Sequence, residues 1–175
     1  MKQLYVLSLY LLVFCAPVRS QNALFIPFGQ TSQQVKDYLS EKEYIRAVQE
    51  DQQLHSLKAT LEENKQVEYA FEDGMLYAVT MTRRYSNKVV GKEIMNSCLD
   101  YMKLISNGAT EQTSKGNVTV YTGVTTARVF KLFITEDPTT LTLALSAVSR
   151  QHGPMLRDPN FYFEVELLEK KFNGN

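Results

Sequence analysis

The chain has 175 residues, of which 44% are hydrophobic and 11% aromatic, and its 19 basic residues balance its 19 acidic residues. This length suits a single domain with one core, and the even charge, with no basic cluster larger than a pair, excludes the basic stripe of a typical nucleic-acid-binding protein. Of the two cysteines, Cys15 lies in the leader described next, so Cys98 is the one thiol left and no internal disulfide is expected.

The first twenty residues have the pattern of an export signal. Lys2 supplies a positive start, residues 4–16 form an almost unbroken apolar run, and small or modest side chains precede Gln21. We therefore expect residues 1–20 to be removed as a signal peptide and residues 21–175 to form one exported domain, periplasmic or extracellular. The apolar run is shorter than the roughly 20 residues that span a bilayer, so no transmembrane segment is expected in the mature chain.

The first expected element is a helix that begins near Ser32 and ends around Lys42. The turn-forming and hydroxyl residues at its start can accept hydrogen bonds from the first free N–H groups of the helix. From Val35 onward, apolar residues at spacings of three and four give one stripe, with polar residues on the other side. Residues 45–54 mix apolar and acidic side chains, and their pattern is compatible with either a longer helix or a loop.

From residue 57 the spacing of apolar residues changes to two, which predicts three strands over residues 57–81. A two-residue Asp73-Gly74 turn would set Phe71 opposite Leu76 and turn the apolar residues of the third strand to the wrong face of the sheet. A loop one residue longer pairs Phe71 with Met75 and avoids this mismatch. We therefore expect the three-residue loop.

The second half of the chain repeats this order of elements. A second helix is expected from Asn87 or Lys88 to Ser106, and the polar residues 109–116 after it predict a flexible connection. The strands expected next cover residues 118–122, 128–135, 140–148 and 161–168. The sequence thus predicts an α+β fold, with an antiparallel sheet of about six to seven strands carrying two helices on one face, arranged as two helix-plus-meander halves.

Four short stretches carry a resemblance to known proteins. They are Phe28-Gly29-Gln30-Thr31-Ser32-Gln33-Gln34-Val35, Tyr38-Leu39, Tyr69-Ala70-Phe71 and Leu76-Tyr77-Ala78-Val79. In these stretches the chain resembles small exported proteins of Bacteroidetes-type bacteria that lack an assigned role. Its layout is also similar to beta-lactamase-inhibitor-like and outer-membrane-assembly-lipoprotein-like domains, which have one or two helices before an antiparallel meander. Those domains bind other proteins, so the resemblance implies a binding role and transfers no functional residue.

The sequence lacks motifs for catalysis or for a cofactor. Cys98 lies on the apolar stripe of the second helix, so we expect a buried core residue rather than a nucleophile partnered by His55 or His152. The two histidines have no metal-ligand spacing, and the glycines are scattered rather than gathered before a helix, so no metal and no other cofactor is expected. Carboxylates such as Glu68 or the Glu164–Glu166 pair could meet across a sheet and hydrolyse a sugar, but outward-facing strand positions explain them more simply.

The expected function is non-catalytic binding of a protein, a peptide or an envelope component, and we do not expect an enzyme. The open sheet face, the sheet edges or the loop from Gln151 to Pro159 would provide the surface. Aromatic side chains near strand ends can anchor a partner, because a ring buries a large area at low entropic cost. The candidate ligand- or partner-binding residues are Tyr69, Tyr77, Tyr101, His152 and Tyr162.

Two alternatives stay open at this stage. The first is a pocket between helices and sheet that takes a small apolar ligand, lined by Tyr69, Tyr77, Val79 and Tyr101. The second is an enzyme with an unrecognised acidic or thiol site, which would show strongly shifted pKa values in a cleft. Separately, Asn117-Val118-Thr119 matches the glycosylation acceptor pattern, which matters only in a eukaryotic secretory route.

Overall fold

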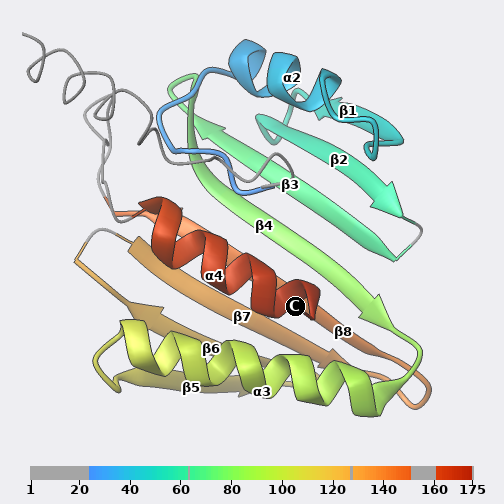
Figure 1. Ribbon diagram of the computed structural model, residues 1–175, viewed down its shortest axis with the longest axis vertical. Coiled ribbons are helices and arrows are strands. Elements are labelled where there is room, and N and C mark those ends of the chain that lie inside the picture. Colours follow the sequence, from blue (N-terminus) through green and yellow to red (C-terminus); the bar gives the residue numbers. More distant parts are fainter. Residues whose placement is uncertain (1–23, 63, 127, 151–160, 175) are drawn as a thin grey trace, which may run out of the picture.

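The computed structural model describes residues 24–62, 64–126, 128–150 and 161–174, and these residues form one antiparallel sheet with helices on one side of it (Figure 1). The predicted α+β class is therefore confirmed. Within this range the sheet has eight strands and there are three helices, so the expected six to seven strands and two helices were too few. The elements are α2 (Ser32–Ser40), β1 (Ala47–Asp51), β2 (Ser56–Glu62), β3 (Lys65–Glu72), β4 (Met75–Tyr85), α3 (Lys88–Ile105), β5 (Thr110–Lys115), β6 (Val118–Val124), β7 (Arg128–Glu136), β8 (Leu141–Ser149) and α4 (Phe161–Asn173).

The sheet consists of two four-stranded meanders joined edge to edge. Its strand order is β1-β2-β3-β4-β8-β7-β6-β5, so each meander runs through consecutive antiparallel strands and the two meet where β4 pairs with β8. α2 precedes the first meander and α3 precedes the second, as the two-halves prediction requires, and α4 follows both. The middle of the sheet is therefore the seam between β4 and β8.

All three helices lie on the same face of the sheet, with α2 near β1 and α4 between α2 and α3 (Figure 1). α3 packs against α4 and against β8 and β6. Each helix buries one stripe of apolar side chains, represented by Val35 and Leu39 on α2, Cys98 and Met102 on α3, and Phe172 on α4, all with 0% exposure. Burying one such side chain contributes about 1.5–3 kcal/mol. Alternate strand residues meet these stripes, so the core is a single layer between sheet and helices.

The chain before α2 also belongs to this core. Leu24, Phe25, Ile26 and Phe28 are buried, and the backbone then runs beside the start of β4. There the Gly29 N–H donates to the Leu76 carbonyl at 2.9 Å, and the Leu76 N–H donates to the Gln30 carbonyl at 2.8 Å. The Thr31 side chain then caps α2 together with Gln34, as the expected helix start requires.

The prediction of a strand over residues 161–168 was wrong, because α4 occupies this stretch. Its aromatic and β-branched residues alternate with acidic ones, which imitates a strand. The helical spacing becomes visible only further on, where Leu168, Glu169 and Phe172 are the buried residues. The expected strand ended at residue 168, before the residues whose spacing shows the helical period.

The flexible connection expected at residues 109–116 is strand β5, and the undecided stretch 45–54 contains strand β1. Both are edge strands of the sheet, and almost all their side chains are exposed. Because an edge strand is held by backbone pairing on one side and covers little core, it needs no apolar alternation. This explains why a search for apolar periodicity missed them.

The three-residue loop expected between β3 and β4 is also wrong. Glu72 pairs with Met75 and Phe71 with Leu76, so the turn is the two-residue Asp73-Gly74, in which both residues have positive φ, 51° and 76°. The mismatch of faces that this turn creates is corrected by a β-bulge at Tyr77, after which Ala70 pairs with Ala78. The extra residue restores the apolar positions of β4 to the core.

Candidate functional site: the open face of the sheet

The face of the sheet opposite the helices is not covered by any helix among the described residues (Figure 1). Its centre carries three rows of side chains, each row running across β3, β4, β8 and β7. The middle row is Glu68, Thr80, Ser146 and Lys131, one flanking row is Ala70, Ala78, Val148 and Val129, and the other is Gln66, Thr82, Ala144 and Phe133. We call these twelve residues the open face.

The two halves of the open face differ in side-chain size. On the β3–β4 side the uncharged residues are small or polar, such as Ala70 and Thr82, and give a flat surface. On the β7–β8 side Val129, Val148 and Phe133 are half-buried and stand higher. Val124 of β6 continues this apolar area and is 47% exposed. A broad, shallow surface with half-exposed apolar side chains is suited to contact with another protein surface.

The charged groups of the open face lie in its middle row. The Glu68 carboxylate is 3.6 Å from the Lys58 ammonium and accepts a hydrogen bond at 3.0 Å from the Ser56 hydroxyl. Between the halves, the Thr80 hydroxyl donates to the Ser146 oxygen at 3.0 Å. Lys131 forms no ion pair with any residue in the described part of the chain. The open face thus presents one acidic and one basic group on opposite sides of the β4–β8 seam.

Three of the residues predicted from sequence as binding residues, Tyr69, Tyr77 and Tyr101, are described, and none of the three is among the twelve residues of the open face. Tyr69 is fully buried on the helix side, and its hydroxyl donates to the Leu24 carbonyl at 2.8 Å. Burial, followed by the negative charge of Glu169, raises the pKa of Tyr69 well above its usual 10. Tyr101 is also buried, on α3, while Tyr77 occupies the bulge of β4.

Several predicted features lie outside the described residues. They are His152, the loop from Gln151 to Pro159, the side chain of Tyr162 and the whole leader, residues 1–20. The side chains of Glu164 and Glu166 are likewise not described. These predictions stay as the sequence left them.

A buried carboxylate on α4 was missed by the sequence analysis. Glu169 is only 5% exposed, and its two oxygens accept hydrogen bonds from the backbone N–H groups of Leu24, at 2.9 and 3.1 Å, and of Phe25, at 3.3 Å. Burial, together with Tyr38 and Glu169, raises the pKa of the nearby Tyr44 to about 12. A helical reading of residues 161–173 would have put Glu169 on the buried stripe. Glu169 thus joins α4 to the segment before α2, from opposite ends of the described chain.

Cys98 is a core residue, as its position on the apolar stripe predicts. It has 0% exposure, and burial, opposed weakly by Lys171, raises the pKa of the thiol to about 12. A thiol with this pKa is protonated at neutral pH and is a poor nucleophile. His55 is exposed in the turn before β2, with φ of 47°. Among the described residues there is also no group of three metal-ligating side chains.

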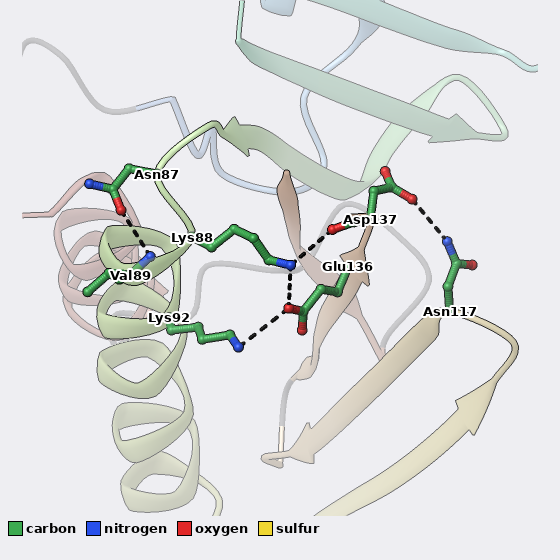
Figure 2. A network of polar contacts seen from close by, with 7 residues as sticks. All are labelled: Asn87, Lys88, Val89, Lys92, Asn117, Glu136 and Asp137. Carbon is green, nitrogen blue, oxygen red and sulfur yellow. Dashed lines mark hydrogen bonds and ion pairs between the residues drawn. The ribbon is translucent and has the colours of Figure 1, made fainter. Parts of the chain in front are cut away.

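A polar network joins the start of α3 to the end of β7 and to Asp137, which follows it (Figure 2). Lys88 lies 2.7 Å from the Glu136 carboxylate and also donates to the Asp137 carbonyl at 3.0 Å, while Lys92 lies 3.4 Å from Glu136. The ammonium of Lys88, followed by that of Lys92, lowers the pKa of Glu136. The exposed Asn117, the possible acceptor of a glycan, donates to the Asp137 carboxylate at 3.4 Å. Each charged side chain of this network already has a partner within it, so the network holds the start of α3 against the end of β7 and offers no free charged group.

A shallow hollow of about 430 Å³ lies beside the β1–β2 turn and is lined by polar residues, among them Gln49, Asp51 and Lys58. It differs from the apolar pocket considered from sequence, whose expected lining residues Tyr69 and Val79 are fully buried in the core. Small apolar ligands bind in enclosed cavities lined mainly by apolar side chains. The hollow does not have that character.

Comparisons of this chain with protein-family models, with curated proteins and with solved structures find no match. The resemblance to small exported proteins stays a prediction. In the part of the chain that the structure describes, no helix combines the length and apolar character needed to cross a membrane.

Proposed function

We propose that this chain is an exported, non-catalytic binding protein that recognises another protein through the open face of its sheet. The observation that carries the proposal is that, among the described residues, three helices cover one side of the eight-stranded sheet and none covers the centre of the other side. Antiparallel sheets with one solvated face normally alternate apolar and polar residues. Here Val129, Val148 and Phe133 occupy solvent-side positions, which is the composition of a contact surface.

The shape of the open face favours a protein over a small molecule. Small side chains such as Ala70, Ala78 and Ser146 leave no walls that would enclose a ligand. A flat surface gains affinity only by covering a large area, which a second protein surface does and a small molecule does not. A protein partner therefore suits this geometry better than the apolar-ligand alternative.

The non-catalytic character is supported by the state of the reactive groups. The raised pKa and full burial of Cys98 argue against a thiol nucleophile. Glu68, the described member of the acidic candidates, is engaged with Lys58 and Ser56. Export rests on the leader pattern of residues 1–20, and no part of the open face depends on it.

The experiment that tests the proposal is site-specific photo-crosslinking in the native envelope. A photoreactive amino acid replaces Thr80 in the middle row, and in a matched control it replaces Leu104, which is 73% exposed on α3. We expect a discrete protein adduct from position 80 and none from position 104. Adducts of equal yield from both positions, or none from position 80, would overturn the proposal.

A second arm asks whether the export prediction holds. Mass measurement of the mature protein from its native cell is expected to give a chain that begins at Gln21. Retention of residues 1–20 in the mature material would contradict export, and would leave the crosslinking result to be judged separately.

A further inference from the structure

We infer that the protein recognised by the open face is a second copy of this chain, stacked face to face about a two-fold axis that runs along the β4–β8 seam. The inference rests on the proposed function, because it names the partner for the same surface. It is carried by the arrangement of charge across the seam, together with the sizes of the side chains on the two sides of the seam.

The first step is the position of the two charges. Glu68 pairs across to Thr80, Thr80 to Ser146, and Ser146 to Lys131, so the four residues form one straight row. Glu68 on β3 and Lys131 on β7 each lie one strand outside the central pair of strands. Three strand spacings separate them, roughly 14 Å, so they are too far apart to pair within one chain.

A two-fold axis along the seam would let the two residues pair between two chains. Rotation about it lays β3 of one chain on β7 of the other, so Glu68 meets Lys131 of the partner subunit. Since a two-fold interface is self-complementary, the second copy of the same contact forms on the other side of the axis. Two equivalent ion pairs then flank the centre of the interface.

The charge pattern also favours this axis over a two-fold axis that runs perpendicular to the strands. An axis perpendicular to the strands, along the middle row, would set every residue of that row against its own copy, including Glu68 against Glu68 and Lys131 against Lys131. Like charges in direct opposition oppose association. The row therefore favours one orientation of the second chain and disfavours the alternative.

Side-chain size follows the same symmetry. The flanking row has Ala70 and Ala78 on one side of the seam and Val148 and Val129 on the other. Under the seam axis, each alanine faces a valine of the second chain. Small residues opposite larger ones allow two faces to pack without gaps or clashes.

The twelve residues of the open face supply about half of a standard interface. Four strands at about 4.8 Å spacing, with about six residues per strand, give a footprint of roughly 380 Å² per chain, and specific interfaces bury about 800 Å² per partner. The face-to-face pair therefore also needs contacts from the neighbouring strands β2 and β6.

The test measures the oligomeric state of the mature chain, residues 21–175, by analytical ultracentrifugation over a concentration series up to about 100 μM. The variants are Glu68→Lys, Lys131→Glu and the double exchange. Each single reversal is expected to raise the dimer dissociation constant about 10- to 100-fold, and the double exchange to return it to within about threefold of the original value. Lys103→Glu, an exposed change on α3, is the matched control and is expected to have no effect.

Circular dichroism of each variant checks that the fold is kept, because Glu68→Lys also removes the Lys58 contact. Lys131 has no ion pair in the described chain. Lys131→Glu therefore tests the face-to-face dimer without breaking an ion pair inside one chain. If the original chain is a monomer throughout the series, or if single reversals leave a dimer intact, the inference is overturned.

Crosslinking from position 80 distinguishes this failure from failure of the proposed function. An adduct of twice the chain mass supports the second copy. An adduct with a different protein removes the second copy and leaves the proposed function standing, whereas no adduct at all removes both.

Discussion

Gly123 of β6 lies directly beneath the hydroxyl of Ser106, the residue that ends α3. A Cβ atom built on Gly123 would overlap the Ser106 Oγ and would stand 3.5 Å from the Ser106 Cβ. The Ser106 hydroxyl is buried and makes no hydrogen bond in the described part of the chain. The end of α3 can therefore pack closely on β6 because Gly123 has no side chain. The Ser106 side chain contributes packing to this contact and no hydrogen bond.

The first prediction follows from this contact. Gly123→Ala should destabilise the protein by about 1–3 kcal/mol, because the added methyl group must displace the end of α3. In a Ser106→Ala background the same change should cost clearly less, since the overlapping oxygen is gone. Urea denaturation of the four proteins of this cycle measures the coupling. Equal costs in both backgrounds would show that the clash is not with Ser106.

The second prediction concerns Glu169, whose carboxylate accepts the Leu24 and Phe25 N–H groups. Glu169→Gln keeps the shape but removes the charge from these hydrogen bonds, so a loss of roughly 1.5–3 kcal/mol in unfolding free energy is expected. The control is Glu93→Gln, an exposed position on α3, with an expected change of under about 0.5 kcal/mol. Similar small effects for both variants would mean that Glu169 does not hold the N-terminal segment.

The third prediction concerns Cys98. Because burial raises the pKa of its thiol from 9.0 to about 12, the thiolate is scarce in the folded protein at pH 8. Alkylation by iodoacetamide should therefore be at least about 100-fold slower in the native protein than in urea. Mass spectrometry of timed samples measures both rates. Rapid native alkylation would instead reveal an accessible thiolate and reopen the thiol alternative.

The fourth prediction is a loss of stability at alkaline pH. The unfolded chain releases its Cys98 and Tyr44 protons near pH 9 and 10, but the folded chain holds both until about pH 12. The unfolded state thus binds fewer protons in this window, and stability that is complete below pH 9 falls as the pH rises towards 12. Urea midpoints measured from pH 8 to 11 should decrease steadily. A flat profile would contradict the raised pKa values.

A matched variant makes the last experiment specific. The Tyr44 hydroxyl is buried without a hydrogen-bond partner among the described residues, so Tyr44→Phe should be neutral or slightly stabilising at pH 7. Above pH 10 the variant should lose less stability than the original protein, because the tyrosine proton no longer contributes. A steeper loss in Tyr44→Phe would disprove this role.

The elements that the sequence revealed are those whose side chains meet the core. α2 and α3 show helical stripes ending in buried residues such as Leu39 and Met102, and the inner strands show alternation. The edge strands β1 and β5 could not be found in this way, because exposed side chains on a backbone-paired strand have no required period. The bulge at Tyr77 was hidden for a different reason: one inserted residue reverses the alternation, and face matching then favours the wrong turn.

The candidate site was foreseeable only in part. An open sheet face was expected, but its middle row depends on which residues of β3, β4, β8 and β7 lie opposite each other, and that register joins strands far apart in the chain. Of the aromatic candidates, Tyr69 and Tyr101 lie in the core and not on this face. Glu169 was hidden by the mistaken strand at the end of the chain.

The contact between Leu24 and Glu169 joins residues 145 positions apart. The buried N–H groups of Leu24 and Phe25 therefore lack these acceptors until α4 has been synthesised and has packed on the sheet. Folding that depends on such distant contacts is slow, so we expect the segment before α2 to dock late in folding.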